Sequence, residues 1–115
     1  MLAGARMSHL RHELDSVIHS PVRFSIMAAL SPLERAGFRM LRDTVEVSDS
    51  ALSQHLTTLE KAGYVEVRKE QKGRRTTTWV SLTRQGREAF GHHLRTLNRI
   101  AEQPATGAPG DVANT

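Results

Sequence analysis

The sequence contains no cysteine, few aromatic residues and no long apolar stretch. Without cysteine the chain can form no disulfide, thiolate metal site or cysteine nucleophile, and the cytoplasm is the location we expect. No stretch approaches the roughly 20 apolar residues that a membrane span needs, and residues 1–7 lack the apolar core of a signal peptide. The aromatic content is 4%, so the stacking platforms that hold single-stranded nucleic acid are nearly absent. Of the nucleic acids, duplex DNA is therefore favoured over single strands.

Catalytic signatures are missing too. Serine, histidine and aspartate occur, but the sequence has no Gly-x-Ser-x-Gly elbow, no phosphate-cradling glycine loop and no His-Glu-x-x-His zinc motif. We therefore expect no enzyme, no catalytic residue and no cofactor. The 115 residues, 38% of them hydrophobic and 24% charged, fit one soluble domain. A net charge of +4 permits an anionic partner without requiring one.

Apolar spacing predicts helices in the first half of the chain, over residues 10–18, 21–30 and 38–45, with a loop over 31–37. The first helix would carry an apolar stripe of Leu10, Leu14, Val17 and Ile18. The second would begin at Ser20-Pro21, because a capping hydroxyl followed by proline is typical of a helix start. Three helices thus precede the most informative part of the sequence.

The clearest helical pattern begins at Ser48, an expected N-cap, and ends before Gly63, an expected left-handed C-cap. Its apolar stripe is Leu52, Leu56 and Leu59. The exposed side of this helix carries polar residues, namely Ser48, Ser50, Ser53, Gln54, Thr57 and Lys61. A DNA major groove offers matching donors, acceptors and thymine methyls, with Gln54 the best candidate for adenine. The hydroxyl groups discriminate less between bases, and some of them would contact phosphates.

After Gly63 the pattern changes to alternation, over residues 64–69 and 76–82, which predicts two strands joined by the polar connection Glu70 to Arg75. This hairpin carries a group of basic residues, namely Arg68, Lys69, Lys72, Arg74 and Arg75. Basic side chains that neutralise phosphates strengthen duplex binding without reading sequence. Taken alone, either the polar helix face or the charged hairpin tip could be ordinary solvated surface. Side by side they favour a duplex-binding interpretation.

Thr83 is the expected N-cap of a last helix. We expect one domain over residues 9–102, preceded by a flexible start, residues 1–8, and followed by a disordered tail, residues 103–115. The last helix has a seam of apolar residues, namely Phe90, Leu94, Leu97 and Ala101. With Leu10, Leu14 and Val17 of the first helix, this seam predicts a homodimer interface. The alternative is that the two terminal helices pack on each other within one chain.

The motifs at residues 18–23, 47–65 and 82–87 resemble the winged-helix regulators of the MarR and ArsR type, and most closely the small group labelled winged helix DNA-binding domain. The resemblance implies an α+β, mostly helical fold. It implies that Ser48 to Ala62 is the recognition helix, Val65 to Val80 the wing, and the terminal helices the dimer interface. The implied function is sequence-specific binding of double-stranded DNA by a dimeric repressor, on a palindromic operator.

Regulation by a metal or a small molecule, as in ArsR-type proteins, is an alternative. Histidines and glutamates do occur in the terminal helices, namely His9, His12, Glu13, Glu88, His92 and His93. The chain has no cysteine and lacks the paired ligand pattern of such sensors, so we expect no metal site; a small-molecule effector stays open. A winged-helix adaptor that binds proteins is a further alternative, but an adaptor does not need the basic hairpin. We expect His55 to be half-buried and hydrogen-bonded.

Overall fold

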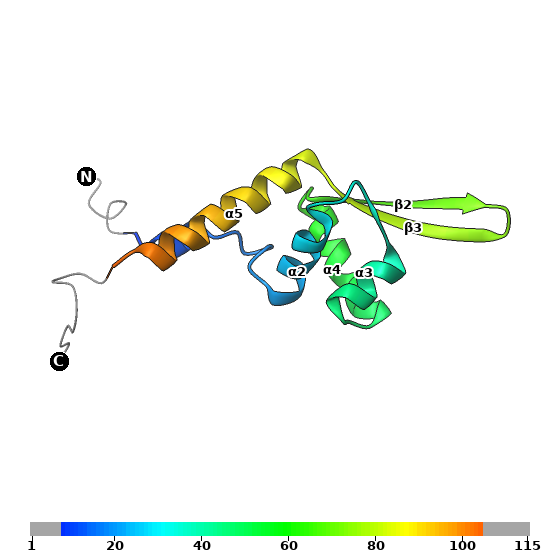
Figure 1. Cartoon of the computed structure of the whole chain (residues 1–115), viewed down its shortest axis with the longest axis horizontal. Helices are drawn as coiled ribbons and strands as arrows, with labels where there is room; N and C mark the ends of the chain where they lie inside the picture. The colour runs from blue at the N-terminus through cyan, green and yellow to red at the C-terminus, as the bar shows by residue number, and fades with distance from the viewer. Residues whose placement is uncertain (1–7, 105–115) are drawn as a thin grey trace.

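The computed structural model describes residues 8–104, so most of the expected flexible start and disordered tail lies outside the described residues. The elements in chain order are η1 (Leu10–Glu13), α2 (Pro21–Leu30), β1 (Ala36–Gly37), α3 (Phe38–Val45), α4 (Asp49–Lys61), β2 (Val65–Lys72), β3 (Arg75–Leu82) and α5 (Arg84–Glu102). Figure 1 shows α2, α3 and α4 as a central body from which α5 and the β2–β3 hairpin extend in opposite directions. The expected α+β, mostly helical architecture is confirmed. None of the helices in this part of the chain has the length and apolar character needed to cross a bilayer.

Side-chain caps fix where three of the helices begin. Ser20, Ser48 and Thr83 each accept a hydrogen bond from the backbone N–H three residues later. These bonds satisfy N–H groups that would otherwise have no partner in the first turn. At the other end of α4, Gly63 adopts a φ of 83°, the left-handed conformation that glycine reaches without strain. All three caps and the glycine position were predicted correctly.

The core lies between α2, α4 and the sheet. Its members include the expected α4 stripe together with apolar residues of α2, α3, β2, β3 and α5, namely Ile26, Leu41, Leu52, Leu56, Leu59, Val65, Val80 and Phe90. Leu52 and Leu59 are fully buried. Because this stripe faces inward, the opposite side of α4 must face solvent.

The sheet has three strands in the order β1-β3-β2, all antiparallel. The short strand β1 was not predicted: Ala36 and Gly37 lie in the expected loop and pair with Val80 and Trp79. The expected connection Glu70 to Arg75 is also wrong, because only Gly73 and Arg74 lie outside the strands. Gly73 has a φ of 64°, and a glycine at this place in a two-residue turn lets the strands pair up to the tip.

The predicted first helix is wrong beyond Glu13. Only the single turn η1 is helical, and Leu14 is extended. The Asp15 carboxylate accepts hydrogen bonds from the N–H groups of Val17 and Ile18, and such a side-chain turn competes with helix formation. The N–H of Asp15 itself donates to Nδ1 of His93 on α5, at 3.2 Å. The segment therefore wraps onto α5 and does not stand as a separate amphipathic helix.

The end of α4, both ends of the hairpin and the start of α5 meet in a cluster that we call the Tyr64 junction, formed by Gly63, Tyr64, Thr83 and Gly86. The Thr83 N–H donates to the Tyr64 carbonyl at 3.0 Å, and the Thr83 hydroxyl donates to the Gly63 carbonyl at 2.6 Å. The Tyr64 hydroxyl donates to Asp15, and this bond, followed by burial, raises the pKa of Tyr64 to about 12. The end of α4, the base of the hairpin and the start of α5 are thus tied to one cluster.

We expect Gly86→Ala to break the Tyr64 junction. A Cβ at Gly86 would lie 2.1 Å from the Tyr64 carbonyl oxygen, and a backbone atom cannot move aside as a flexible side chain can. The free energy of unfolding should fall by about 3 kcal/mol, measured by urea denaturation. Gly91→Ala in the same helix is the control, since its Cβ would meet only the end of the Arg95 side chain; it should stabilise by up to about 1 kcal/mol. A Gly86→Ala variant as stable as the parent would disprove the close contact.

Candidate nucleic-acid interface

The face of α4 opposite the leucine stripe carries the residues expected to contact DNA. All of them are exposed, namely Ser48, Ser50, Ser53, Gln54, Thr57 and Lys61. The Thr57 hydroxyl donates to the Ser53 carbonyl at 2.9 Å. This hydroxyl therefore has no proton left to donate to a partner outside the helix. The Gln54 side chain makes no hydrogen bond to any residue in the described part of the chain. Its amide is free to pair with an external donor and acceptor.

The first turn of α4 contains an acidic residue whose charge is offset. Asp49 accepts a hydrogen bond from Nη1 of Arg42 at 2.9 Å, and Arg42 also contacts Asp43 at 3.0 Å. The bond to Asp49, followed by that to Asp43, raises the pKa of Arg42 above its ordinary value. This pair ties the end of α3 to the start of α4. It also reduces the repulsion that Asp49 would exert on an approaching phosphate.

His55 lies on the flank of α4 and links it to α2. Its Nδ1 lies 3.2 Å from Nη1 of Arg23, whose Nε donates to the Val17 carbonyl. Burial, followed by the nearby Arg23 charge, lowers the pKa of His55. The expectation of a half-buried, hydrogen-bonded histidine is confirmed.

The basic residues of the hairpin divide between its two faces. Val67 pairs with Val80 on the face that packs into the core, so alternation places Lys69 and its partner Thr78 on this same face. Arg68 lies on the opposite face, where it contacts Glu66 at 3.2 Å. The sequence alternation already contained this division, but the five basic residues were predicted as one group.

Two hollows lie where the hairpin faces the helices. One, of about 330 Å³, separates α4 from the hairpin and is lined by Phe38, Ser53, Leu56, Thr57, Glu60, Val67, Lys69 and Thr78. The other, of about 450 Å³, separates the start of α3 from β3 and is lined by residues 37–40 and 75–78. The structure thus brings Ser53 and Thr57 together with Lys69, and Arg75 together with α3.

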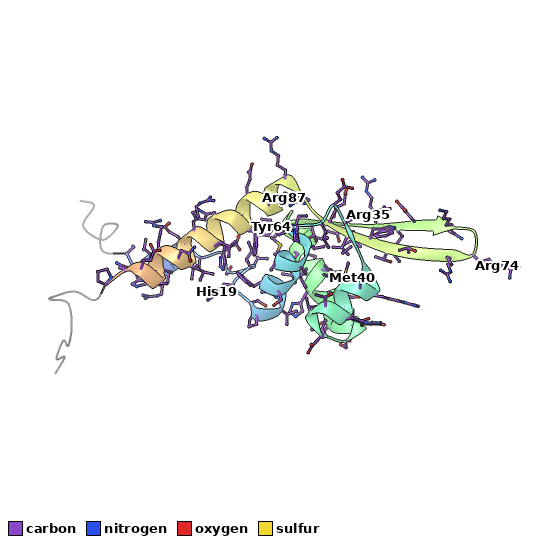
Figure 2. All side chains as sticks on the ribbon, in the orientation of Figure 1. His19, Arg35, Met40, Tyr64, Arg74 and Arg87 are labelled. Carbon is purple, nitrogen blue, oxygen red and sulfur yellow. The ribbon has the colours of Figure 1, made fainter. Side chains whose placement is uncertain are left out.

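Arg39 and Met40 line the second hollow and were not among the predicted site residues. Met40 is 49% exposed. The apolar spacing of Phe38, Leu41 and Val45 leaves both residues off the buried side of α3, but nothing in the sequence placed them beside β3. Arg74, by contrast, occupies the hairpin tip, far from Tyr64 at its base (Figure 2). Lys72 pairs with Arg75 next to this tip.

The predicted dimer residues divide between core and surface. Phe90 is buried, and the centroid of its ring lies 5.3 Å from the centroid of the Phe24 ring. Val17 also packs against the core. Leu94 is 37% exposed. The other predicted positions, Leu10, Leu14, Leu97 and Ala101, are half-buried or exposed. Phe90 and Val17 therefore serve the fold of one chain, and the remaining positions stay available at the surface.

An apolar hollow of about 300 Å³ lies between α2 and α5, lined by His19, Ser20, Pro21, Phe24 and Leu97. A small-molecule effector in such a position stays a prediction. Within residues 8–104 no three histidine, aspartate or glutamate side chains gather as metal ligands would. His93 is fully buried, and burial, followed by the adjacent His19, lowers its pKa.

Comparison with known proteins gives consistent matches. The family described as winged helix DNA-binding domain matches residues 22–101. An uncharacterized protein from Methanocaldococcus jannaschii is 31% identical over 86 residues, which cover 75% of this chain and 94% of the relative. The transcriptional regulator homologue from Pyrococcus horikoshii OT3 superposes with a TM-score of 0.70 at 28% identity, covering 75% of this chain and 85% of the homologue. NolR from Sinorhizobium fredii superposes with a TM-score of 0.58 at 28% identity, covering 74% of this chain and 77% of NolR.

Lys69 and Arg68 provide a matched pair of adjacent basic residues on opposite faces of the hairpin. We expect Lys69→Ala to weaken binding to a mixed-sequence duplex and to reduce the salt slope of log K by about 1, because the hollow lined by Ser53 and Thr57 adjoins Lys69. Arg68→Ala should bind nearly as the parent does. The measurement is a fluorescence anisotropy titration of labelled duplex at several salt concentrations. Equal losses for the two variants would show that the hairpin binds without a preferred face.

Proposed function

This chain belongs to the winged helix DNA-binding domain family and is a DNA-binding transcriptional regulator, and we propose that it acts as a dimeric repressor. In this proposal residues 48–62 read bases in the major groove while the wing, residues 65–80, anchors on phosphates. The observation that supports it most is the exposed polar face of α4 beside Lys69 on the near face of the wing. Repression then needs only that the bound protein covers a promoter.

Base selection in this proposal depends on a few side chains of α4. Gln54 has a free amide, and a glutamine amide can pair with both N6 and N7 of adenine. Ser50 and Ser53 carry hydroxyl groups that accept or donate, so they would discriminate weakly or contact phosphates. The Thr57 hydroxyl donates to the Ser53 carbonyl and leaves only an acceptor and a methyl group for a base. Gln54 is accordingly the residue that we expect to contribute most to sequence preference.

The dimer in this proposal forms through α5. This helix extends away from the central body (Figure 1), and η1 is held against its far end by the ion pair between Arg99 and Glu13 at 3.2 Å. Leu94, Leu97 and Ala101 leave apolar surface along it, and such surface tends to be covered by a partner. Two chains related by a twofold axis would place their α4 helices on an inverted repeat, with half-sites about one helical turn apart.

Selection of bound sequences from a random duplex library tests base reading. We expect the parent to enrich an inverted repeat, and Gln54→Ala to lose the preference for adenine at one position of each half-site. Replacing Arg74 and Arg75 together by alanine should leave the enriched sequence unchanged but weaken binding to every duplex and flatten its salt dependence. If the parent enriches no sequence, base reading by α4 is excluded; if Gln54→Ala enriches the parent's sequence, Gln54 does not read it.

Sedimentation velocity tests the dimer. We expect Leu94→Glu with Leu97→Glu to give monomers that bind the enriched repeat much more weakly, because two facing glutamates would have to be buried in the interface. The control is His92→Glu with Arg95→Gln, which lowers the net charge by the same amount at exposed positions of α5 outside the apolar seam. An unchanged dimer in the Leu94 and Leu97 variant, with the fold checked by circular dichroism, would remove this seam from the interface.

A further inference from the structure

Arg35, in the loop that precedes β1, holds two residues of the wing at once. Its guanidinium lies over the Trp79 ring, 3.8 Å from the ring centroid. Its Nη1 donates to Oε2 of Glu70 at 2.9 Å. Figure 2 shows Arg35 at the base of the wing, where the hairpin leaves the central body. One side chain from the body thus contacts both long strands.

The contact to Glu70 lies farther out along the hairpin than the strand pairing of β1. Gly37, the last residue of β1, pairs with Trp79, whereas Glu70 pairs with Thr77, two residues nearer to the tip. From Arg68 to Thr77 every side chain of the hairpin is exposed. An isolated two-stranded hairpin is only marginally stable in water, so the direction of this exposed part depends on braces such as Arg35.

The loop from which Arg35 reaches is itself held in place. Arg87 of α5 donates from Nη1 to the Ser31 carbonyl at 2.8 Å and from Nη2 to the Leu33 carbonyl at 3.0 Å. Immediately after β1 the chain enters α3, which the Arg42 and Asp49 pair ties to α4. A displacement of Arg35 relative to α4 would therefore have to break contacts at both ends of its loop.

We propose that Arg35 is a positioning residue that fixes the direction of the wing relative to α4, so that both reach one duplex together. This inference rests on the proposed function, in which the wing and α4 bind the same DNA. A brace that holds the wing in its binding direction lowers the ordering cost of association. Arg35 acts through Trp79 and Glu70, on the face opposite to Lys69, and does not itself contact the DNA.

The competing explanation is electrostatic. Arg35 and Glu70 are 47% and 56% exposed, and an exposed ion pair often contributes little to stability. On that explanation Arg35 would only add positive charge that attracts phosphates, and Glu70 would only subtract from it. The combined change Arg35→Ala with Glu70→Gln removes one charge of each sign, so it leaves the net charge unchanged and separates the two explanations.

The matched control is Arg68→Ala with Glu66→Gln. This pair lies on the same face of the hairpin, with its two members 3.2 Å apart, and it makes the same change of charge. Both of its members belong to the hairpin, so it does not link the wing to the body. We expect the Arg35 and Glu70 variant to bind the duplex about tenfold more weakly than the control does. Equal affinities for the two variants would overturn the positioning role.

Trp79 gives a direct readout of the brace, because it is the one tryptophan of the chain. Time-resolved fluorescence anisotropy of the free protein should show a larger gain in local motion of Trp79 in the Arg35 and Glu70 variant than in the control, although Arg68 of the control is the cross-strand partner of Trp79. Arg35→Lys, which keeps a cation near the ring and near Glu70, should restore most of the affinity and of the slow motion. Unchanged Trp79 motion in the Arg35 and Glu70 variant would contradict the brace.

Failure of the inference and failure of the proposed function are distinguishable. If the parent binds no duplex, the proposed function fails, and Trp79 motion in the free protein still decides whether Arg35 braces the wing. If the Arg35 and Glu70 variant does not fold, as judged by thermal unfolding, Arg35→Lys and Glu70→Gln are compared separately. Simple electrostatics predicts tighter binding for Glu70→Gln, whereas a brace predicts weaker binding.

Discussion

The Tyr64 carbonyl group is the point on which the arrangement of α4, the β2–β3 hairpin and α5 depends. It accepts the N–H of Thr83, and the backbone of Gly86 lies so close to it that no side chain fits between them. Gly63 and Tyr64 connect α4 to β2, and Thr83 connects β3 to α5. The directions of α4, the β2–β3 hairpin and α5 are therefore set together, over a span too short for one of them to turn independently of the others.

The consequences of this constraint grow with distance from the junction. The wing tip at Arg74 is far from Tyr64 (Figure 2), so a small rotation at the base would move the tip by a large amount. The structure adds braces outside the junction: Arg87 holds the loop before β1, and Arg35 connects that loop to Glu70 and Trp79. On the opposite side, Asp15 connects Tyr64 to the segment that wraps α5. These contacts hold the hairpin and α5 to the central body on both sides of the junction.

The parts that the sequence predicted well are those that local chemistry determines. The N-caps at Ser20, Ser48 and Thr83 and the buried stripe of α4 follow from neighbouring residues, and the structure confirms them. The helix expected over 10–18 is wrong because Asp15 captures nearby N–H groups, which apolar spacing does not reveal. The Arg35 contact with Trp79 joins residues far apart in the chain, and no periodicity indicates such a pair. The two faces of the wing, in contrast, were encoded in the alternation of Val65, Val67 and Lys69.

The net charge of the chain is only +4, so the position of its positive charge depends on which basic side chains form ion pairs with acidic ones. Three arginines of this region are engaged with acidic partners, namely Arg35 with Glu70, Arg42 with Asp49, and Arg68 with Glu66. Within residues 8–104 no ion pair is found for Lys69, Arg74 or Arg75. Lys69 and Arg75 line the hollows that face α4 and α3, and Arg74 lies at the tip. Pairing therefore decides where positive charge is left on the hairpin, and in our proposal the Arg35 pair also directs the wing.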